Sequence, residues 1–342
     1  MSDPFSTVAT ELPRDRWGRP LITPPEGGEP VAYQRVTTFV GALEDTYHLG
    51  EWGKRTVALG MSKRPDLIAL AASITDPKDP SQKKTLNSIA KSAMEAAAGS
   101  AAANKGTALH SLTEAIDEGR EPSYVPEEFI ADLEAYRQVR ERFEFIDSEG
   151  FCVRDDLRVG GSYDRLFTLR DTSTPLIAPD GEQVVGGVWD LKSGGSEGSL
   201  FGIGKIAMQL GTYRNSKKYD HTLGSRTDLP GEDFMSRTWG IVCHLPAGTG
   251  RASLLWVDIA SGWEAAYEIA PRVHAWRKRK DLSQPLASAE VSPRNVGIPE
   301  QIAAATSYAD LQAIHAANRI VWTAGLTSAA AARKRELEAA SK

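Results

Sequence analysis

The stretch VVGGVWDLKSGG, residues 184–195, carries the most structural information in this sequence. Its apolar and β-branched residues predict a strand from Val184 to Lys192, and the glycines after it predict a turn. Because side chains alternate between the two faces of a strand, Asp190 and Lys192 project from the same face, one pleat apart. Charged side chains at the end of a buried strand must be satisfied there. The two residues therefore form either an ordinary ion pair or part of a functional site.

Other segments with the apolar pattern of strands lie on both sides of this stretch. They are residues 151–153, 157–169, 238–245 and 253–259. Turns are predicted where Pro, Asp and Gly gather, at 179–181 and at 246–250. Helices are predicted from the spacing of apolar residues and from residues that favour helix starts and ends. They lie within 35–70, over 86–103, from about 106 to a stop at Gly119, and over 127–145, 201–218 and 262–280. Elements in this order predict an α/β fold with a mixed central sheet flanked by helices.

The two ends of the chain differ from its middle. Prolines and glycines crowd the beginning and predict an irregular arm over residues 1–34. A single large domain is expected over 35–285. A helical tail is expected over 286–342, where Ser307-x-x-Asp310 has the pattern of a helix-capping box.

Composition narrows the class of protein. The 342 residues are 41% hydrophobic and 25% charged, the balance of a soluble globular protein. No apolar run is long enough to span a bilayer, and residues 1–16 are too polar for a secretory signal, so no membrane partner is expected. The two cysteines, Cys152 and Cys243, fit a reducing cytoplasm and cannot supply the four thiolates of an ordinary iron–sulfur cluster. The net charge of −5 means that any affinity for DNA must come from local basic patches or metal ions.

A third charged residue, Asp164, lies in the strand predicted before the Asp-x-Lys stretch and can lie beside Asp190 and Lys192. Paired carboxylates hold hard cations such as Mg²⁺ or Mn²⁺ through oxygen ligands. Such a cation lowers the pKa of a bound water and neutralises charge at a phosphodiester. Lys192 would position the attacking water, and the carbonyl of Leu191 is within reach of the same cation. The cluster therefore indicates metal-dependent hydrolysis of phosphodiester bonds.

The order Asp…Asp-x-Lys resembles the signature of the PD-(D/E)XK nuclease superfamily. Two flanking motifs resemble its RecB-like exonuclease branch, which includes bacteriophage exonucleases. One is Gly106-Thr107-Ala108-Leu109-His110, which matches a Gly-x-x-x-His helix, and the other is Gln209-Leu210-Gly211-Thr212-Tyr213, which matches a Gln-x-x-x-Tyr helix. The resemblance covers about residues 104–260 and follows the family order. Because the chain lacks four cysteines, it resembles the cluster-free, bacteriophage-type members.

The resemblance implies a restriction-endonuclease-like core with helical additions at both ends. It also implies a Mg²⁺- or Mn²⁺-dependent DNA nuclease, an exonuclease in recombination, repair or phage replication, working in the cytoplasm of a bacterial host with a recombination or replication protein as a further partner. The implied catalytic residues are Asp164, Asp190 and Lys192, and the implied metal ligands are His110, Asp164, Asp190 and the carbonyl of Leu191. Gln209, Tyr213, Arg214 and Lys217 are the expected DNA-binding residues, the last two as contacts to backbone phosphates.

Simpler interpretations stay open for the same residues. His110 can be an ordinary core or surface residue, and Asp164 can pair with its neighbour Arg165. Gln209 and Tyr213 can pack their helix on the sheet, and basic residues on helices often serve solubility. Relatives also carry a glutamate on the strand before the first aspartate, and here Glu149, Asp155 and Asp156 are equal candidates.

Alternatives also exist for the whole protein. It can be a nuclease-fold DNA-binding or assembly subunit that does not cut, or an endonuclease with the same chemistry. Glycine-rich residues 194–205 lack the full spacing of a nucleotide-binding P-loop, so a nucleoside triphosphatase is rejected. Residues 194–199 are expected instead to form a turn at the rim of the site.

Overall fold

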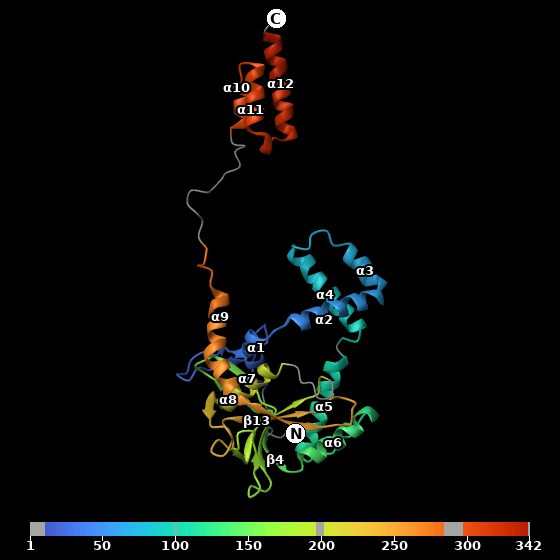
Figure 1. Ribbon diagram of the computed structural model, residues 1–342, viewed down its shortest axis with the longest axis vertical. Coiled ribbons are helices and arrows are strands. Elements are labelled where there is room, and N and C mark those ends of the chain that lie inside the picture. The colour runs from blue at the N-terminus through green and yellow to red at the C-terminus, as the bar shows by residue number, and fades with distance from the viewer. Residues whose placement is uncertain (1–10, 100, 196–201, 284–296, 341–342) are drawn as a thin grey trace, which may run out of the picture. The chain divides into compact units, whose positions relative to one another are not determined.

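The computed structural model describes residues 11–99, 101–195, 202–283 and 297–340, with the side chains of 101–103 left aside. The chain divides into two compact units, Met1–Lys278 and Arg279–Lys342. Figure 1 shows the first unit built around sheets and the second built from helices. Among the described helices, none combines the length and the apolar character needed to cross a bilayer.

The main sheet of the first unit has five strands in the order β14-β13-β10-β7-β4. Their bounds are β4 Phe143–Ser148, β7 Arg165–Leu169, β10 Gly186–Lys192, β13 Trp239–His244 and β14 Ser253–Asp258. β10 runs parallel to β13, and the other neighbours are antiparallel. The predicted α/β fold with a mixed sheet is therefore confirmed.

A second five-stranded sheet has the order β12-β11-β5-β6-β3. Its strands are β3 Gln34–Arg35, β5 Phe151–Arg154, β6 Val159–Ser162, β11 Lys217–Asp220 and β12 Ser225–Thr227. The prediction of one strand over 157–169 is wrong, because the chain leaves this sheet after β6 and enters the main sheet at β7. Buried Tyr163 lies at the crossing and donates a hydrogen bond to Asp147 of β4 at 2.5 Å. Asp164 follows it, so this aspartate lies at the junction of the two sheets.

Helices cover both faces of the main sheet because neighbouring residues of β10 point in opposite directions. Val188 packs among residues of α1 (Val36–Val40), α7 (Ile203–Arg214) and α8 (Ile259–Glu264). Trp189 and Leu191 pack on the other face, among residues of α5 (Ala101–Asp117) and α6 (Ile130–Arg140). On that face Trp189 makes edge-on contacts with Phe143 and Phe167. This sandwich holds the end of β10 in place.

Several predicted helices have different bounds. The helix predicted over 127–145 is a short 3₁₀ turn followed by α6, and from Phe143 onward the residues belong to β4, where they pair with β7. The helix predicted over 201–218 ends at Arg214, and Lys217 lies in β11. The helix predicted over 262–280 is α8, a π-helical turn at Ala265–Ile269 and then α9 (Ala270–Lys278). In the first two cases strand pairing overrides local helical spacing.

The predicted alanine-rich helix over 86–103 is broken near Ala98, whose φ of 58° is left-handed. Its first part is α4 (Pro80–Ala96), which packs with α2 (Tyr47–Ser62) and α3 (Pro65–Ala72) around Leu67, Ile89 and Ala93. Its second part is α5. The break separates this small helical cluster from the helix that bears His110.

The beginning of the described chain is more ordered than predicted. The arm forms β1 (Leu21–Ile22), β2 (Val31–Ala32) and β3, and Ile22 and Tyr33 are buried. The turn predicted at 179–181 is confirmed between β8 (Leu176–Ile177) and β9 (Gln183–Val184), where Gly181 donates to the carbonyl of Ala178 at 2.9 Å. The turn predicted at 246–250 is also confirmed, between β13 and β14.

The second unit contains α10 (Ile298–Ala304), α11 (Tyr308–Ala317), a 3₁₀ turn at Arg319–Val321 and α12 (Ala324–Ala340). The predicted capping box is confirmed, because the side chains of Ser307 and Asp310 each accept a hydrogen bond from the other residue's backbone N–H. The predicted start of the tail at residue 286 lies outside the described residues.

Candidate active site

Two predicted site residues from distant parts of the chain meet at the junction of the two sheets. His110 projects from α5, and its Nδ1 lies 3.7 Å from Oδ2 of Asp164. The same carboxylate oxygen accepts a hydrogen bond from the backbone N–H of Leu191 at 2.9 Å. The backbone of Leu191 also interacts with the His110 ring. Asp164 is thus held between α5 and the end of β10.

The contact between α5 and the end of β10 explains why the Gly-x-x-x-His motif has a glycine at position 106. A Cβ atom on Gly106 would lie 2.7 Å from Oγ of Ser193, the residue that follows β10. Real Cβ atoms essentially never approach an atom this closely. The absence of a side chain therefore lets α5 lie against the end of β10, one helical turn before His110.

Asp190 and Lys192 form an ion pair, with Nζ of the lysine 2.5 Å from Oδ2 of the aspartate. The Asp190 side chain is 1% exposed, whereas the Lys192 side chain is 31% exposed. Burial, and after it the charge of Asp164, raises the pKa of Asp190 to about 7. Oδ1 of Asp190 has no hydrogen-bond partner within the part of the chain that the structure describes. A buried carboxylate with a free oxygen carries a large desolvation cost unless another group satisfies it.

The surroundings of His110 and Lys192 also shift the pKa values of these two side chains. Burial lowers the pKa of His110, and Asp164 opposes this effect only in part, so the ring is neutral and has a lone pair to offer at neutral pH. Burial alone would lower the pKa of Lys192, but the charges of Asp190 and Asp164 reverse this, and its pKa is raised. Lys192 therefore stays a cation.

Two glutamates outside the predicted catalytic and metal-binding set line the same site. A hollow of about 510 Å³ is bounded by His110, Glu114, Glu149 and Asp164, together with small residues of α5 and Ser193. Glu149 has a left-handed φ of 51°, and its N–H donates to the carbonyl of Asp164 at 2.9 Å. Partial burial of its carboxyl group, and then the nearby Asp164 and Glu114, raise its pKa to about 7.

The sequence left three acids as equal candidates for the family's additional glutamate. Asp155 forms hydrogen bonds with Arg226 and Tyr33, and Asp156 forms hydrogen bonds with Arg154. Neither residue lines the hollow, whereas Glu149 does. The structure therefore distinguishes Glu149 from the other two.

The donor set suits a hard divalent cation in its chemistry. It offers carboxylate oxygens, one of them unpartnered, and a neutral imidazole nitrogen. The 3.7 Å between His110 and Asp164 is a span that two ligands of one cation can bridge, since each would lie about 2.0–2.2 Å from it. Among the described residues, no group of three or more His, Cys, Asp or Glu side chains lies close enough together to hold a metal ion. Oδ2 of Asp190, in particular, points to Lys192.

Behind the site lies a buried polar network that the sequence did not predict. Arg165, the residue after Asp164, pairs with Asp117 of α5 and donates to Thr113 at 3.0 Å. Tyr136 donates to the same Asp117 at 2.7 Å. Thr113 and Asp117 follow His110 at helical spacings of three and seven residues. This spacing is the feature of the sequence from which their shared helix face could have been predicted. The network ties the helix of His110 to the strand that begins beside Asp164.

The Gln-x-x-x-Tyr motif lies on α7, on the face of the sheet to which Asp190 points. Gln209 donates to the hydroxyl of Tyr213 at 3.3 Å. Tyr213 is 2% exposed, and its ring lies against Gly161 of β6. The prediction of direct DNA contact is wrong for Tyr213, which packs α7 on the second sheet. Gln209 is half-buried.

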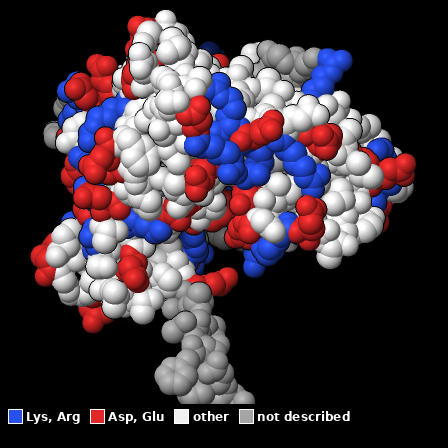
Figure 2. Space-filling model, turned by 90° about the horizontal axis from the view of Figure 1, so that it is seen from below, with Lys and Arg blue, Asp and Glu red and all other residues white. Residues whose placement is uncertain are grey.

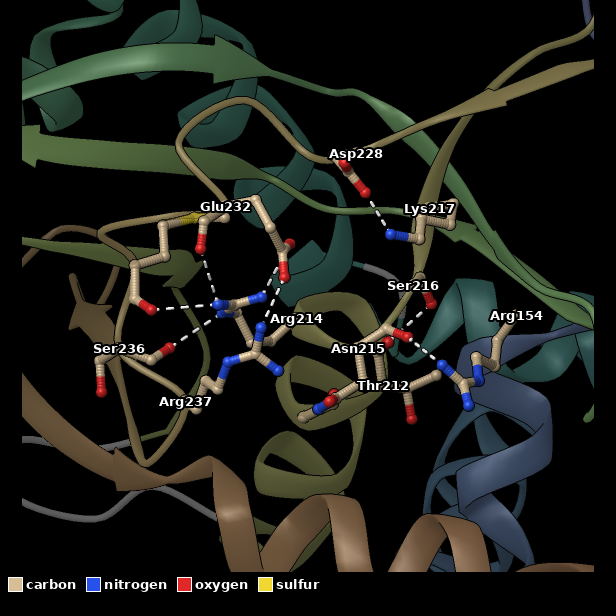
Figure 3. A network of polar contacts seen from close by, with 12 residues as sticks. Arg154, Thr212, Arg214, Asn215, Ser216, Lys217, Asp228, Glu232, Ser236 and Arg237 are labelled. Atoms are coloured by element: carbon tan, nitrogen blue, oxygen red, sulfur yellow. Dashed lines mark hydrogen bonds and ion pairs between the residues drawn. The ribbon is translucent and has the colours of Figure 1, made fainter.

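The burial of Arg214 also argues against a DNA contact, and Figure 3 shows the contacts that its side chain makes instead. Its side chain is 1% exposed and pairs with Glu232 at 2.9 Å. The guanidinium also donates to the backbone carbonyls of Glu232, Met235 and Ser236. The group serves to fix the loop that leads into β13, and it offers nothing to a phosphate.

Lys217 fits its predicted role better but lies on a strand. Its side chain is 53% exposed and pairs with Asp228 (Figure 3). On the face drawn in Figure 2, Lys and Arg side chains alternate with Asp and Glu side chains.

The sequence matches no protein-family model and no curated protein. The resemblance to the nuclease superfamily therefore stays a prediction that depends on the motifs and on the geometry described above.

Proposed function

We propose that this protein is a metal-dependent nuclease that hydrolyses phosphodiester bonds of DNA, acting as an exonuclease. The observation that carries the proposal is that His110 and Asp164 lie 3.7 Å apart and that Asp164 is hydrogen-bonded to the backbone of Leu191, between the ion-paired Asp190 and Lys192 of β10. A hollow beside them is open to solvent and lined by further carboxylates. The resemblance of the motif order to RecB-like exonucleases supports a role in recombination, repair or phage replication.

The residues divide the chemistry among them. A bound Mg²⁺ or Mn²⁺ would supply Lewis acidity and a water of lowered pKa. Asp164, oriented by the Leu191 N–H, and the neutral ring of His110 would hold that cation, together with the free oxygen of Asp190. Lys192 places a fixed positive charge where the phosphate gains negative charge. Glu149, with a pKa of about 7, can accept the proton that the attacking water loses.

The test is cleavage of end-labelled linear DNA by the purified protein with Mg²⁺ or Mn²⁺, beside an EDTA control. We expect Lys192→Ala and Asp164→Asn to lower the rate by at least about 100-fold while circular dichroism shows that both variants are folded. Lys63→Ala, which changes an exposed lysine in the turn directly after α2, is the matched control and should cut normally.

Two results would overturn the proposal. One is full metal-dependent activity in Lys192→Ala, and the other is a folded wild type that binds DNA without cutting it. The second result would instead favour a non-cutting assembly subunit. Covalently closed circular DNA separates the remaining options, because an exonuclease leaves it intact and an endonuclease opens it.

A further inference from the structure

The second unit has a groove of its own between α11 and α12, with a volume of about 520 Å³. Three rings line it, those of Tyr308, His315 and Trp322, and so do two cations, Arg319 and Lys334. All lining residues belong to this unit. The volume falls in the range typical of ligand sites in proteins.

Tyr308 and His315 lie outside the core of the unit, whereas Trp322 is half-buried and packs against it. The core consists of aliphatic side chains, namely Ile298, Ile302, Ala305, Leu311 and Leu326. Tyr308 is 52% exposed although it begins a helix beside that core. An aromatic side chain that stays in water forgoes the favourable free energy of burial, so rings outside the core indicate a binding surface.

Local contacts fix the rings of the groove in place. The Trp322 indole N–H donates to Oγ1 of Thr327 at 3.0 Å. The ring of His315 stands edge-on to Trp322, with centroids 4.7 Å apart. Rings held in this way lose little conformational freedom when a flat ligand stacks on them.

The charge of the groove is positive. Nζ of Lys334 lies 4.5 Å from the centre of the Tyr308 ring, and Arg319 lines the same hollow. No Asp or Glu is among the lining residues, and Glu338, 3.7 Å from Lys334, lies outside them. Residues 279–342 hold eight Lys and Arg against six Asp and Glu, a net charge of +2, whereas the whole chain has −5. The unit therefore favours an anionic ligand.

We propose that this groove binds single-stranded nucleic acid, with unpaired bases stacked on its rings and backbone phosphates beside Arg319 and Lys334. Stacking on aromatic side chains and neutralisation by nearby cations are the general means by which proteins hold single strands. Duplex DNA fits less well, because its bases are already stacked on one another and present only their edges.

This function is separate from the proposed cleavage. It depends on residues of the second unit alone, and it would hold even if the first unit did not cut DNA. In a nuclease the groove would retain a strand on the same chain that carries the active site, which raises the effective concentration of that strand.

The test measures binding of a 5′-labelled oligothymidylate to the full-length protein in EDTA, so that cleavage does not occur. We expect Tyr308→Ala and Arg319→Ala each to weaken binding by at least about fivefold. Arg319→Ala should also lower the salt dependence, by a slope of about 0.7 in log K against log salt. Two exposed residues outside the lining serve as controls, Ile320→Ala in the same turn and Arg335→Ala on α12, and both should bind as the wild type does.

Circular dichroism melting confirms that each variant is folded, and both groove substitutions alter exposed side chains. Unchanged binding in Tyr308→Ala and Arg319→Ala would overturn the proposal, as would tighter binding of duplex than of single strands. Absence of any single-strand binding by the wild type would overturn it too. A cleavage assay on the same variants reports separately on the first unit, so failure of one proposal does not imply failure of the other.

Discussion

Arg165 of β7 and Asp117 of α5 form a buried ion pair directly behind the contact between His110 and Asp164. Both side chains of the pair are at most 2% exposed. Arg165 follows Asp164 in the chain, and Asp117 lies two helical turns after His110. The pair therefore sets the distance between the strand that begins directly after one proposed ligand and the helix that carries the other.

We expect Asp117→Asn to destabilise the protein by about 3–5 kcal/mol, because Arg165 would remain buried without a counter-charge. Since α5 would no longer be clamped, Mn²⁺ affinity should fall as well. Urea unfolding measures the first effect, and a Mn²⁺ titration at a temperature where the variant is folded measures the second. Glu118→Gln, its exposed neighbour paired with Arg120, is the control and should leave both unchanged. Wild-type Mn²⁺ affinity in folded Asp117→Asn would contradict the positioning role.

The raised pKa of Asp190 predicts a pH dependence. Between its unfolded value of 3.8 and about 7, folded Asp190 keeps a proton that the unfolded chain has released. The free energy of unfolding of the metal-free protein should therefore fall as pH rises through this window. A bound cation must displace that proton, so Mn²⁺ affinity should weaken up to about tenfold per pH unit below 7.

Melting temperatures with and without Mn²⁺, at about pH 6 and about pH 8, measure this effect. The rise caused by Mn²⁺ should be larger at the higher pH and absent in Asp190→Asn. A rise of equal size at both values would show that Asp190 does not give up a proton to the cation.

Arg214→Ala tests the correction made to the DNA-binding residues. Removing this buried group leaves the carbonyls of Met235 and Ser236 without their donor, and Glu232 keeps only its pairing with Arg237. We expect a loss of about 3 kcal/mol in the free energy of unfolding. Lys217→Ala, which removes an exposed partner of Asp228, should cost at most about 1 kcal/mol. A stable Arg214→Ala that loses only DNA affinity would restore the original assignment.

The contrast between these residues shows what the sequence can predict here. Asp190 and Lys192 share a face because strand alternation is local, and the structure has them in contact. The same local rule failed at Asp164, because residues 157–169 keep an apolar pattern while the backbone changes sheets. Nothing near Arg214 reveals its burial, since its partners come from a loop 18 to 22 residues later. Contacts made by tertiary structure alone were therefore missed.

Gly106 offers a test of how closely α5 must approach β10. The hydroxyl of Ser193 can rotate away from an added Cβ, but its own Cβ lies only 4.0 Å away, so the branched side chain of Gly106→Val should push the helix away and widen the gap between His110 and Asp164. Overpacking of this kind costs about 1–3 kcal/mol. We expect the rise in melting temperature caused by Mn²⁺ to be lost together with DNA cleavage.

Gly53→Val is the matched control for this substitution. Gly53 also lies in a helix, α2, but a Cβ atom there meets nothing within 4 Å. Since valine has a better helix propensity than glycine, this variant should be as stable as the wild type or slightly more so. If Gly106→Val kept its Mn²⁺ response at wild-type strength, the close approach of α5 to the end of β10 would have no part in binding the cation.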